Sequence, residues 1–167
     1  MSSIGHYDSE AVRCEQIGAH TASCIMLGAA IKGFLVLAVS AFPEQAEKGL
    51  EKLRANNNGK DLRISNVLRW DFADLLMVAE ATGWLPKHVP PSSFGDEPLA
   101  VGLVKDLRNL VHPGRLIRTR QGRIISKEEL DQLQQTCSAI YLHFARTLLP
   151  DLSGIINGSA EPQPDSR

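Results

Sequence analysis

The chain has 167 residues, of which 43% are hydrophobic and 5% aromatic. This composition excludes global disorder and predicts one domain whose core is built mainly from Leu, Ile, Val and Ala, as in packed helices. The net charge of −1 by itself favours no nucleic-acid partner. Three cysteines without a C-x-x-C pair, and an N-terminus without the basic-then-apolar order of a signal peptide, predict a cytoplasmic protein.

The first predicted helix is long and becomes strongly apolar toward its end. Asp8 or Ser9 can cap its N-terminus, and Pro43 is expected to end or kink it. One face carries small or apolar residues at alternating spacings of three and four, namely Ile17, Thr21, Cys24, Gly28, Ile31, Leu35, Ala38 and Phe42. A membrane-spanning helix over residues 24–42 is the alternative, but Lys32 near its centre disfavours insertion. We therefore expect a buried bundle helix and no membrane association.

Two shorter helices are predicted next. Residues 43–60 indicate a polar helix stopped by "NNNG", and residues 65–84 indicate a helix ended by Gly83. The apolar stripe expected on the latter consists of Leu68, Phe72, Leu75, Leu76 and Ala79. Trp84 follows the helix stop, and we expect it to cap the core rather than to stack on a nucleobase.

The last two predicted helices flank a basic connector. After a loop rich in Pro, Ser and Gly, a helix begins near Glu97 and ends around His112, because Pro113 disfavours helical geometry in the residue before it. "SKEE" forms a capping box that starts the final helix at Ser126. Its apolar face consists of Leu130, Leu133, Cys137, Ile140, Tyr141, Phe144 and Leu148. We expect a single domain over residues 1–154 and a disordered tail over residues 155–167.

Positive charge is concentrated in one stretch of the chain. Between Lys105 and Lys127 the only acid is Asp106, so this stretch carries +6 while the rest of the chain carries −7. Its basic residues are Lys105, Arg108, Arg115, Arg118, Arg120, Arg123 and Lys127. Such a basic block can create a local positive field for a phosphate backbone, although many basic runs are solvated loops without a partner.

"KDLRNLVHPGR", residues 105–115, contains a pair of residues suited to phosphodiester chemistry. Arg108 and His112 are four residues apart and so share a helix face at about 6 Å. A forked, permanently charged guanidinium can hold a phosphate, and an imidazole can move a proton near neutral pH. Asn109 is placed to orient either side chain. A helix stop at His-Pro-Gly, with the arginine bonded to the last carbonyls, is the structural alternative.

"LRNLVHPGR", together with the preceding "EQIGAHTASCIMLGAAIKGFLVL", resembles the HEPN superfamily of small helical bundles, over segments from about Glu10 to Leu149. In that family an arginine, usually followed by a polar residue, is separated from a histidine by a spacer of four to six residues, and two protomers commonly bring their motifs together. The resemblance implies an all-α, HEPN-like bundle of about five helices that forms a homodimer. The implied catalytic residues are Arg108, Asn109 and His112, and Lys105, Arg115, Arg118, Arg120 and Arg123 would bind RNA. In this chain only three residues separate Arg108 from His112.

Two classes of function follow from these observations. The first is an RNA-binding protein, as a metal-independent ribonuclease of a toxin–antitoxin or defence system. The second is a non-catalytic helical interaction module, a partner or antitoxin-like component whose protein partner is encoded nearby. No cofactor or metal is expected, because His20 and Cys24, although four residues apart, have no third ligand near them in the sequence.

Overall fold

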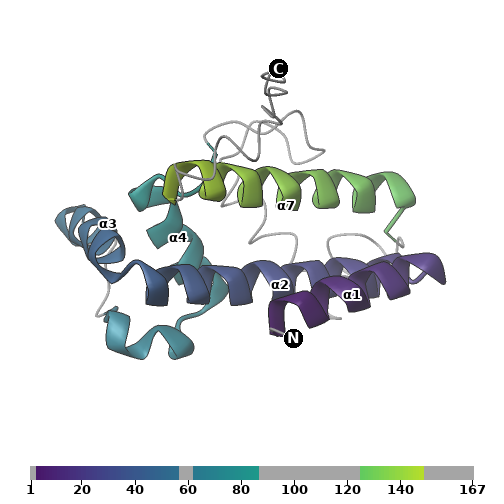
Figure 1. Cartoon of the computed structure of the whole chain (residues 1–167), viewed down its shortest axis with the longest axis horizontal. Helices are drawn as coiled ribbons and strands as arrows, with labels where there is room; N and C mark the ends of the chain where they lie inside the picture. The colour runs from purple at the N-terminus through teal and green to yellow at the C-terminus, as the bar shows by residue number, and fades with distance from the viewer. Residues whose placement is uncertain (1–2, 57–61, 87–124, 149–167) are drawn as a thin grey trace, which may run out of the picture.

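The computed structural model describes residues 3–56, 62–86 and 125–148, and within these ranges all regular structure is helical (Figure 1). The elements are α1 (Ser3–Gln16), α2 (His20–Ala41), α3 (Pro43–Ala55), the 3-10 helix η1 (Ile64–Arg69), α4 (Phe72–Thr82) and α7 (Lys127–Leu148). The all-α prediction is therefore confirmed for the described part of the chain.

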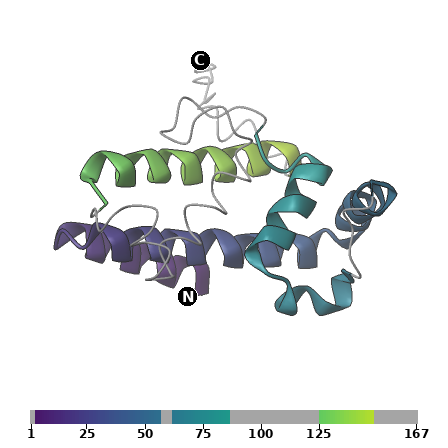
Figure 2. The same cartoon turned by 180° about the vertical axis from the view of Figure 1, so that it is seen from behind.

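α2 is the central element. α1 runs antiparallel along its N-terminal half, since the Ser23 hydroxyl on α2 donates to the carbonyl of Ala11 at 2.8 Å and Gly33 lies beside Ile4. α7 lies along another face of α2, and α3, α4 and η1 gather at the carboxyl end of α2 (Figures 1 and 2). The side chains of Ile31, Leu35, Ala38 and Val39 are buried between these layers.

The prediction of one long first helix is wrong, because the structure has two helices, α1 and α2, in this part of the chain. The chain is already helical at Ser3, and it turns at Gly18, whose φ of 74° lies in the left-handed region that glycine adopts without strain. Two backbone hydrogen bonds close this turn, from Gly18 to Glu15 and from Ala19 to Cys14, each at 2.8 Å. The seam residue Ile17 is consequently 81% exposed instead of packed.

The expected buried seam is confirmed further along α2. Cys24, Ile31, Leu35 and Ala38 are all buried, and the charged Lys32 is exposed. Of the helices in the described ranges, α2 is the one with the length and hydropathy to cross a membrane. It contacts α1, α3, α4, α7 and η1.

α3 is the predicted short polar helix, and Pro43 stands at its start as expected. It packs closely on α4 at Gly49, where an added Cβ would lie 2.6 Å from Thr82 Cγ2 and 3.3 Å from the Val78 oxygen. Lys52 reinforces this contact, because its Nζ donates to the carbonyl of Ala81 at 3.0 Å. The absence of a side chain at Gly49 therefore sets the distance between the two helices.

The helix predicted over residues 65–84 is divided into η1 and α4. Asp71 starts α4 through a capping box: the Asp74 amide donates to Asp71 Oδ1 at 2.8 Å, and the Asp71 amide donates to Asp74 Oδ2 at 3.2 Å. Leu68, placed on the predicted apolar stripe, lies before this break and is 84% exposed. Gly83 ends α4 with φ 80°, as predicted.

α7 begins and packs as the sequence predicts. The Ser126 amide donates to Glu129 Oε2 at 2.9 Å and the Glu129 amide donates to Ser126 Oγ at 3.2 Å, which confirms the capping box. Its buried residues include Leu130, Leu133, Cys137, Ile140 and Phe144. α7 runs parallel to α2. Ile125, just before α7, contacts His20 at the start of α2, and Phe144 near the end of α7 packs against Phe42 just after α2.

Candidate functional site

Every residue predicted to bind or cleave RNA lies outside the described residues, within the segment 87–124. This applies to Lys105, Arg108, Asn109, His112, Arg115, Arg118, Arg120 and Arg123. The helix predicted from Glu97 to His112 lies in the same segment. What the structure defines is how the chain is held immediately before and immediately after this segment.

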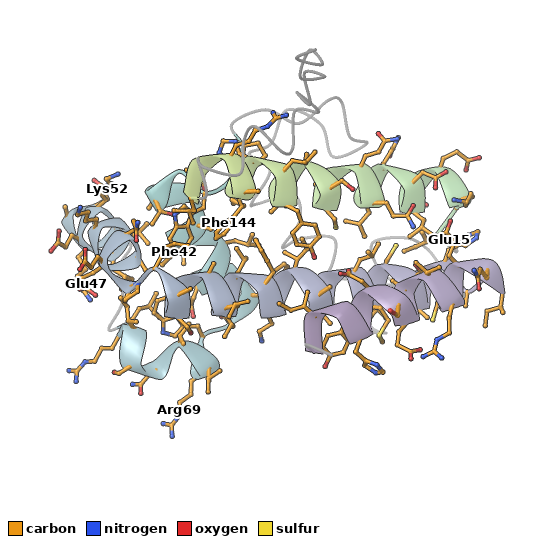
Figure 3. All side chains as sticks on the ribbon, viewed as in Figure 1. Glu15, Phe42, Glu47, Lys52, Arg69 and Phe144 are labelled. Carbon is orange, nitrogen blue, oxygen red and sulfur yellow. The ribbon has the colours of Figure 1, made fainter. Side chains whose placement is uncertain are left out.

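Before the segment, the chain is held by an aromatic cluster made of Phe42, Trp84 and Phe144. The Trp84 ring centroid lies 5.6 Å from that of Phe144 and 6.5 Å from that of Phe42, both in tilted, edge-on geometry. Figure 3 shows Phe42, which links α2 to α3, and Phe144 of α7 at this end of the bundle. Trp84 is 1% exposed, so its ring cannot stack on a base, and its predicted role as a cap of the core is confirmed.

After the segment, the chain is held by a polar cluster around Glu15, the last acidic residue of α1. Lys127 Nζ donates to Glu15 Oε1 at 2.7 Å, and Gln134 Nε2 donates to Glu15 Oε2 at 2.6 Å. Lys127 also pairs with Asp131 one turn further along α7. Ile125 is 3% exposed, and its carbonyl oxygen lies 3.3 Å from His20 Nδ1. We call Glu15, His20, Lys127, Asp131 and Gln134 the Glu15 cluster (Figure 3 labels Glu15).

Hydrogen bonding sets the charge state of this cluster. Donation from Lys127, and then from Gln134, holds the pKa of the Glu15 carboxyl below its usual value. The hydrogen bonds of Lys127 to Asp131 and to Glu15 raise the pKa of its ammonium group. Both groups are therefore ionised at neutral pH. Lys127 is the one member of the predicted basic block within the described ranges, and acids of the bundle itself neutralise it.

The aromatic cluster and the Glu15 cluster lie at opposite ends of α7. This helix has 22 residues, so it is about 33 Å long at about 1.5 Å per residue. Trp84 contacts Phe144 near its carboxyl end, whereas Ile125 precedes its first residue. Trp84 and Ile125, which flank the segment 87–124, therefore lie near opposite ends of the bundle.

The buried titratable groups on α7 are not arranged as nucleophiles. Burial raises the pKa of the Cys137 thiol to about 12, and burial also raises the pKa of the Tyr141 hydroxyl. The Tyr141 hydroxyl has no hydrogen-bond partner among the described residues, and its ring packs edge-on against Phe34 at 4.9 Å. His143 Nε2 lies 3.0 Å from the carbonyl oxygen of Gly83 at the end of α4. Cys137 and Tyr141 therefore serve packing, as predicted for the apolar face of this helix, and His143 links α7 to the end of α4.

No metal site is formed within the described ranges, where no three of the His, Cys, Asp and Glu side chains come together. His20 instead directs Nδ1 at the Ile125 carbonyl, and Cys24 is buried in the core. The contact of Glu15 with Lys127 has no signal in the sequence, because the two residues are 112 positions apart along the chain. Only the Lys127–Asp131 spacing of four was visible as a local signal.

Comparisons of the chain with protein-family models, with curated proteins and with solved structures found no match. The resemblance to the HEPN superfamily therefore stays a prediction. The motif and its charge, both read from the sequence, are the observations that bear on a function.

Proposed function

We propose that the chain is a HEPN-like RNA-binding protein that cleaves RNA without a metal ion, through Arg108 and His112. The observation that carries this proposal is the "RNLVH" motif inside a basic stretch. With Lys127 neutralised by Glu15 and Asp131, the stretch still has six basic residues against Asp106 alone. This charge suits a phosphate backbone better than an uncharged partner.

Each motif residue has a distinct part in the proposed reaction. Arg108 holds the scissile phosphate through its forked guanidinium, and Asn109 orients the neighbouring groups. His112 transfers the proton as the ribose 2′-oxygen attacks the adjacent phosphorus and the 5′-oxygen leaves, which yields a 2′,3′-cyclic phosphate end. In a homodimer, two such motifs would face one RNA strand.

The length of the segment is compatible with this proposal. A helix over residues 97–112 would be about 24 Å long, which is shorter than the roughly 33 Å of α7. The other residues of the segment therefore suffice to connect such a helix to Trp84 on one side and to Ile125 on the other. This arrangement agrees with a motif carried by a late helix of a bundle, which the family resemblance implies.

The test is RNA cleavage by purified protein in EDTA. We expect the wild-type protein to produce 2′,3′-cyclic phosphate ends, His112→Ala to lose about 100-fold or more in rate, and Arg108→Ala to lose a similar factor. Arg69→Ala is the matched control, because Arg69 is an exposed arginine on η1 (Figure 3). Intact RNA after long incubation with wild-type protein would contradict cleavage. Equal cleavage by His112→Ala would assign the activity to a contaminant.

The second candidate is a non-catalytic interaction module. The three-residue spacer between Arg108 and His112 favours it, since the family that the chain resembles uses four to six residues. This candidate predicts a protein that copurifies with the chain and no RNA shift in a binding gel at low salt. RNA binding at low salt without a protein partner would reject it.

A further inference from the structure

The Glu15 cluster joins the α1–α2 hairpin to the point where the basic segment ends. Glu15 uses both carboxylate oxygens, one for Lys127 Nζ at 2.7 Å and one for Gln134 Nε2 at 2.6 Å. On the same side of the bundle, His20 at the start of α2 contacts the carbonyl of Ile125. These contacts involve the last turn of α1, the first residue of α2 and the first two turns of α7.

The spacing of the Glu15 partners restricts how α7 can move. Lys127 and Gln134 are seven residues apart, so they lie on one face of α7, separated by about 10 Å along its axis. Because the Glu15 carboxylate binds both Lys127 and Gln134, it opposes rotation of α7 about its axis and displacement of α7 along that axis. The buried side chains of α7 and of Ile125 hold this end of the helix against the core, and the capping box with Glu129 restrains Ser126. The Glu15 contacts add a directional restraint at Lys127 and Gln134.

We propose that Glu15 is a positioning residue, which fixes the place and direction in which the basic segment rejoins the bundle. The consequence for RNA rests on the proposed function: with this end held, the arginines before Ile125 need less ordering when RNA binds, so affinity is higher. Glu15 would act without touching RNA.

An alternative effect of the same carboxylate has the opposite sign. If Glu15 mattered only as a negative charge near the RNA, its removal would free Lys127 for a phosphate. RNA binding would then become tighter and more dependent on salt. The two effects can therefore be separated by one substitution.

The experiment compares Glu15→Gln with Glu47→Gln in the full chain. Glu47 is the matched control, because its Oε1 makes an exposed ion pair with Arg54 at the same 2.7 Å, on α3 (Figure 3). Hydrogen exchange is measured on peptides covering residues 120–134. We expect exchange there to be about two- to fivefold faster in Glu15→Gln, because this is the factor that the loss of an exposed ion pair produces. Exchange should be unchanged in Glu47→Gln. The charge swap Glu15→Lys with Lys127→Glu should restore slow exchange.

RNA binding supplies the second measurement on the same proteins, with a single-stranded oligoribonucleotide as the probe. We expect weaker binding by Glu15→Gln with an unchanged slope of affinity against salt, and recovery in the charge swap. Unchanged exchange in Glu15→Gln, or tighter binding with a steeper slope, would overturn the proposal. If the wild-type protein binds no RNA, the proposed function fails, while the exchange data still decide whether Glu15 holds this end of the segment.

Discussion

The two ends of the bundle hold the chain by different physical means. At the carboxyl end of α7, Phe42, Trp84 and Phe144 exclude water and pack edge to face. At its N-terminal end, charged and polar side chains around Glu15 make directional contacts, with Lys127 still 48% exposed. Burial of apolar surface depends little on salt and pH, whereas exposed ion pairs depend on both.

This difference assigns different tasks to the two ends. The aromatic cluster supplies free energy of folding, because large rings bury most of their area there. The Glu15 cluster supplies little free energy but fixes the geometry at Ile125, where the predicted RNA-binding segment ends. A substitution at the first end should therefore change stability, and one at the second end should change local order.

The largest effect is expected for Trp84→Ala. Loss of a ring that is 1% exposed leaves a cavity, and we expect the free energy of unfolding to fall by about 3–5 kcal/mol. Urea denaturation followed by circular dichroism measures this change. Leu142→Ala on the exposed side of α7 is the control and should cost about 0.5 kcal/mol or less. A loss below about 1 kcal/mol for Trp84→Ala would refute the role given to the aromatic cluster.

Gly49→Ala should have the next largest effect, because the added Cβ would meet Thr82 Cγ2 at 2.6 Å. We expect a loss of about 1–3 kcal/mol in the same denaturation experiment. Adding Thr82→Ser should recover part of it, since this removes Cγ2 and keeps the hydroxyl that donates to Val78 and Ala79.

The control for that substitution is Gly33→Ala. Its Cβ would lie 3.4 Å from Ile4 Cγ1, which is an ordinary contact, and alanine favours the helix by about 1 kcal/mol. We expect Gly33→Ala to be neutral or stabilising. Equal losses at both glycines would show that close packing of α3 on α4 is not the cause.

Ser126→Ala should cost about 1 kcal/mol, because it removes the acceptor of the Glu129 amide at the start of α7. Ser40→Ala is a suitable control, since Ser40 lies within α2 and its hydroxyl donates to the Val36 carbonyl one turn earlier. That control should change stability by a few tenths of a kcal/mol at most. Thermal melts of both variants provide the comparison, and identical melting temperatures would argue against the cap.

The smallest effect concerns the pH dependence of the Glu15 cluster, in which Lys127, Gln134 and His20 act on the carboxylate and Asp131 pairs with Lys127. Because the folded-state pKa of Glu15 lies below the 4.5 of an unperturbed glutamate, its contacts stabilise the fold above about pH 4.5. That contribution disappears as the pH falls through the lowered pKa. The stability difference between the wild-type protein and Glu15→Gln should therefore shrink between pH 7 and pH 3. A difference that is constant over this range would contradict the ionised contact.

The parts of the fold that depend on short-range patterns were predictable from the sequence. The Ser126 capping box, the apolar face of α7, Pro43 and the Gly83 helix stop are all local signals, and the structure confirms each of them. The same spacing rule was misleading at Ile17 and Leu68, because the helical periodicity of the sequence continues across positions where the helix itself ends. At Leu68 the sequence did contain a warning, since Asp71 and Asp74 form a capping box that starts α4 after this residue.

Long-range polar contacts could not be predicted in this way. Glu15 meets Lys127 only because α1 folds back along α2 and α7 returns beside it, and no spacing along the chain expresses this. Counting charges placed Lys127 in the basic block, whereas its neighbours in space neutralise it. The RNA-binding role of the residues from Lys105 to Arg123 stays a prediction that rests on their charge and on the motif.

The central claim is that this basic segment binds RNA, and the salt dependence of binding tests it most directly. The affinity of the wild-type chain for a single-stranded oligoribonucleotide is measured at increasing salt, beside a variant with Arg115, Arg118, Arg120 and Arg123 changed to alanine and beside Arg69→Ala. Each lost phosphate contact should lower the magnitude of the slope of log affinity against log salt by about 0.7. The slope of the fourfold variant should therefore be smaller in magnitude by up to about 3, while Arg69→Ala keeps the wild-type slope. Equal slopes for all three proteins, or no RNA binding by the wild-type chain at low salt, would contradict the claim.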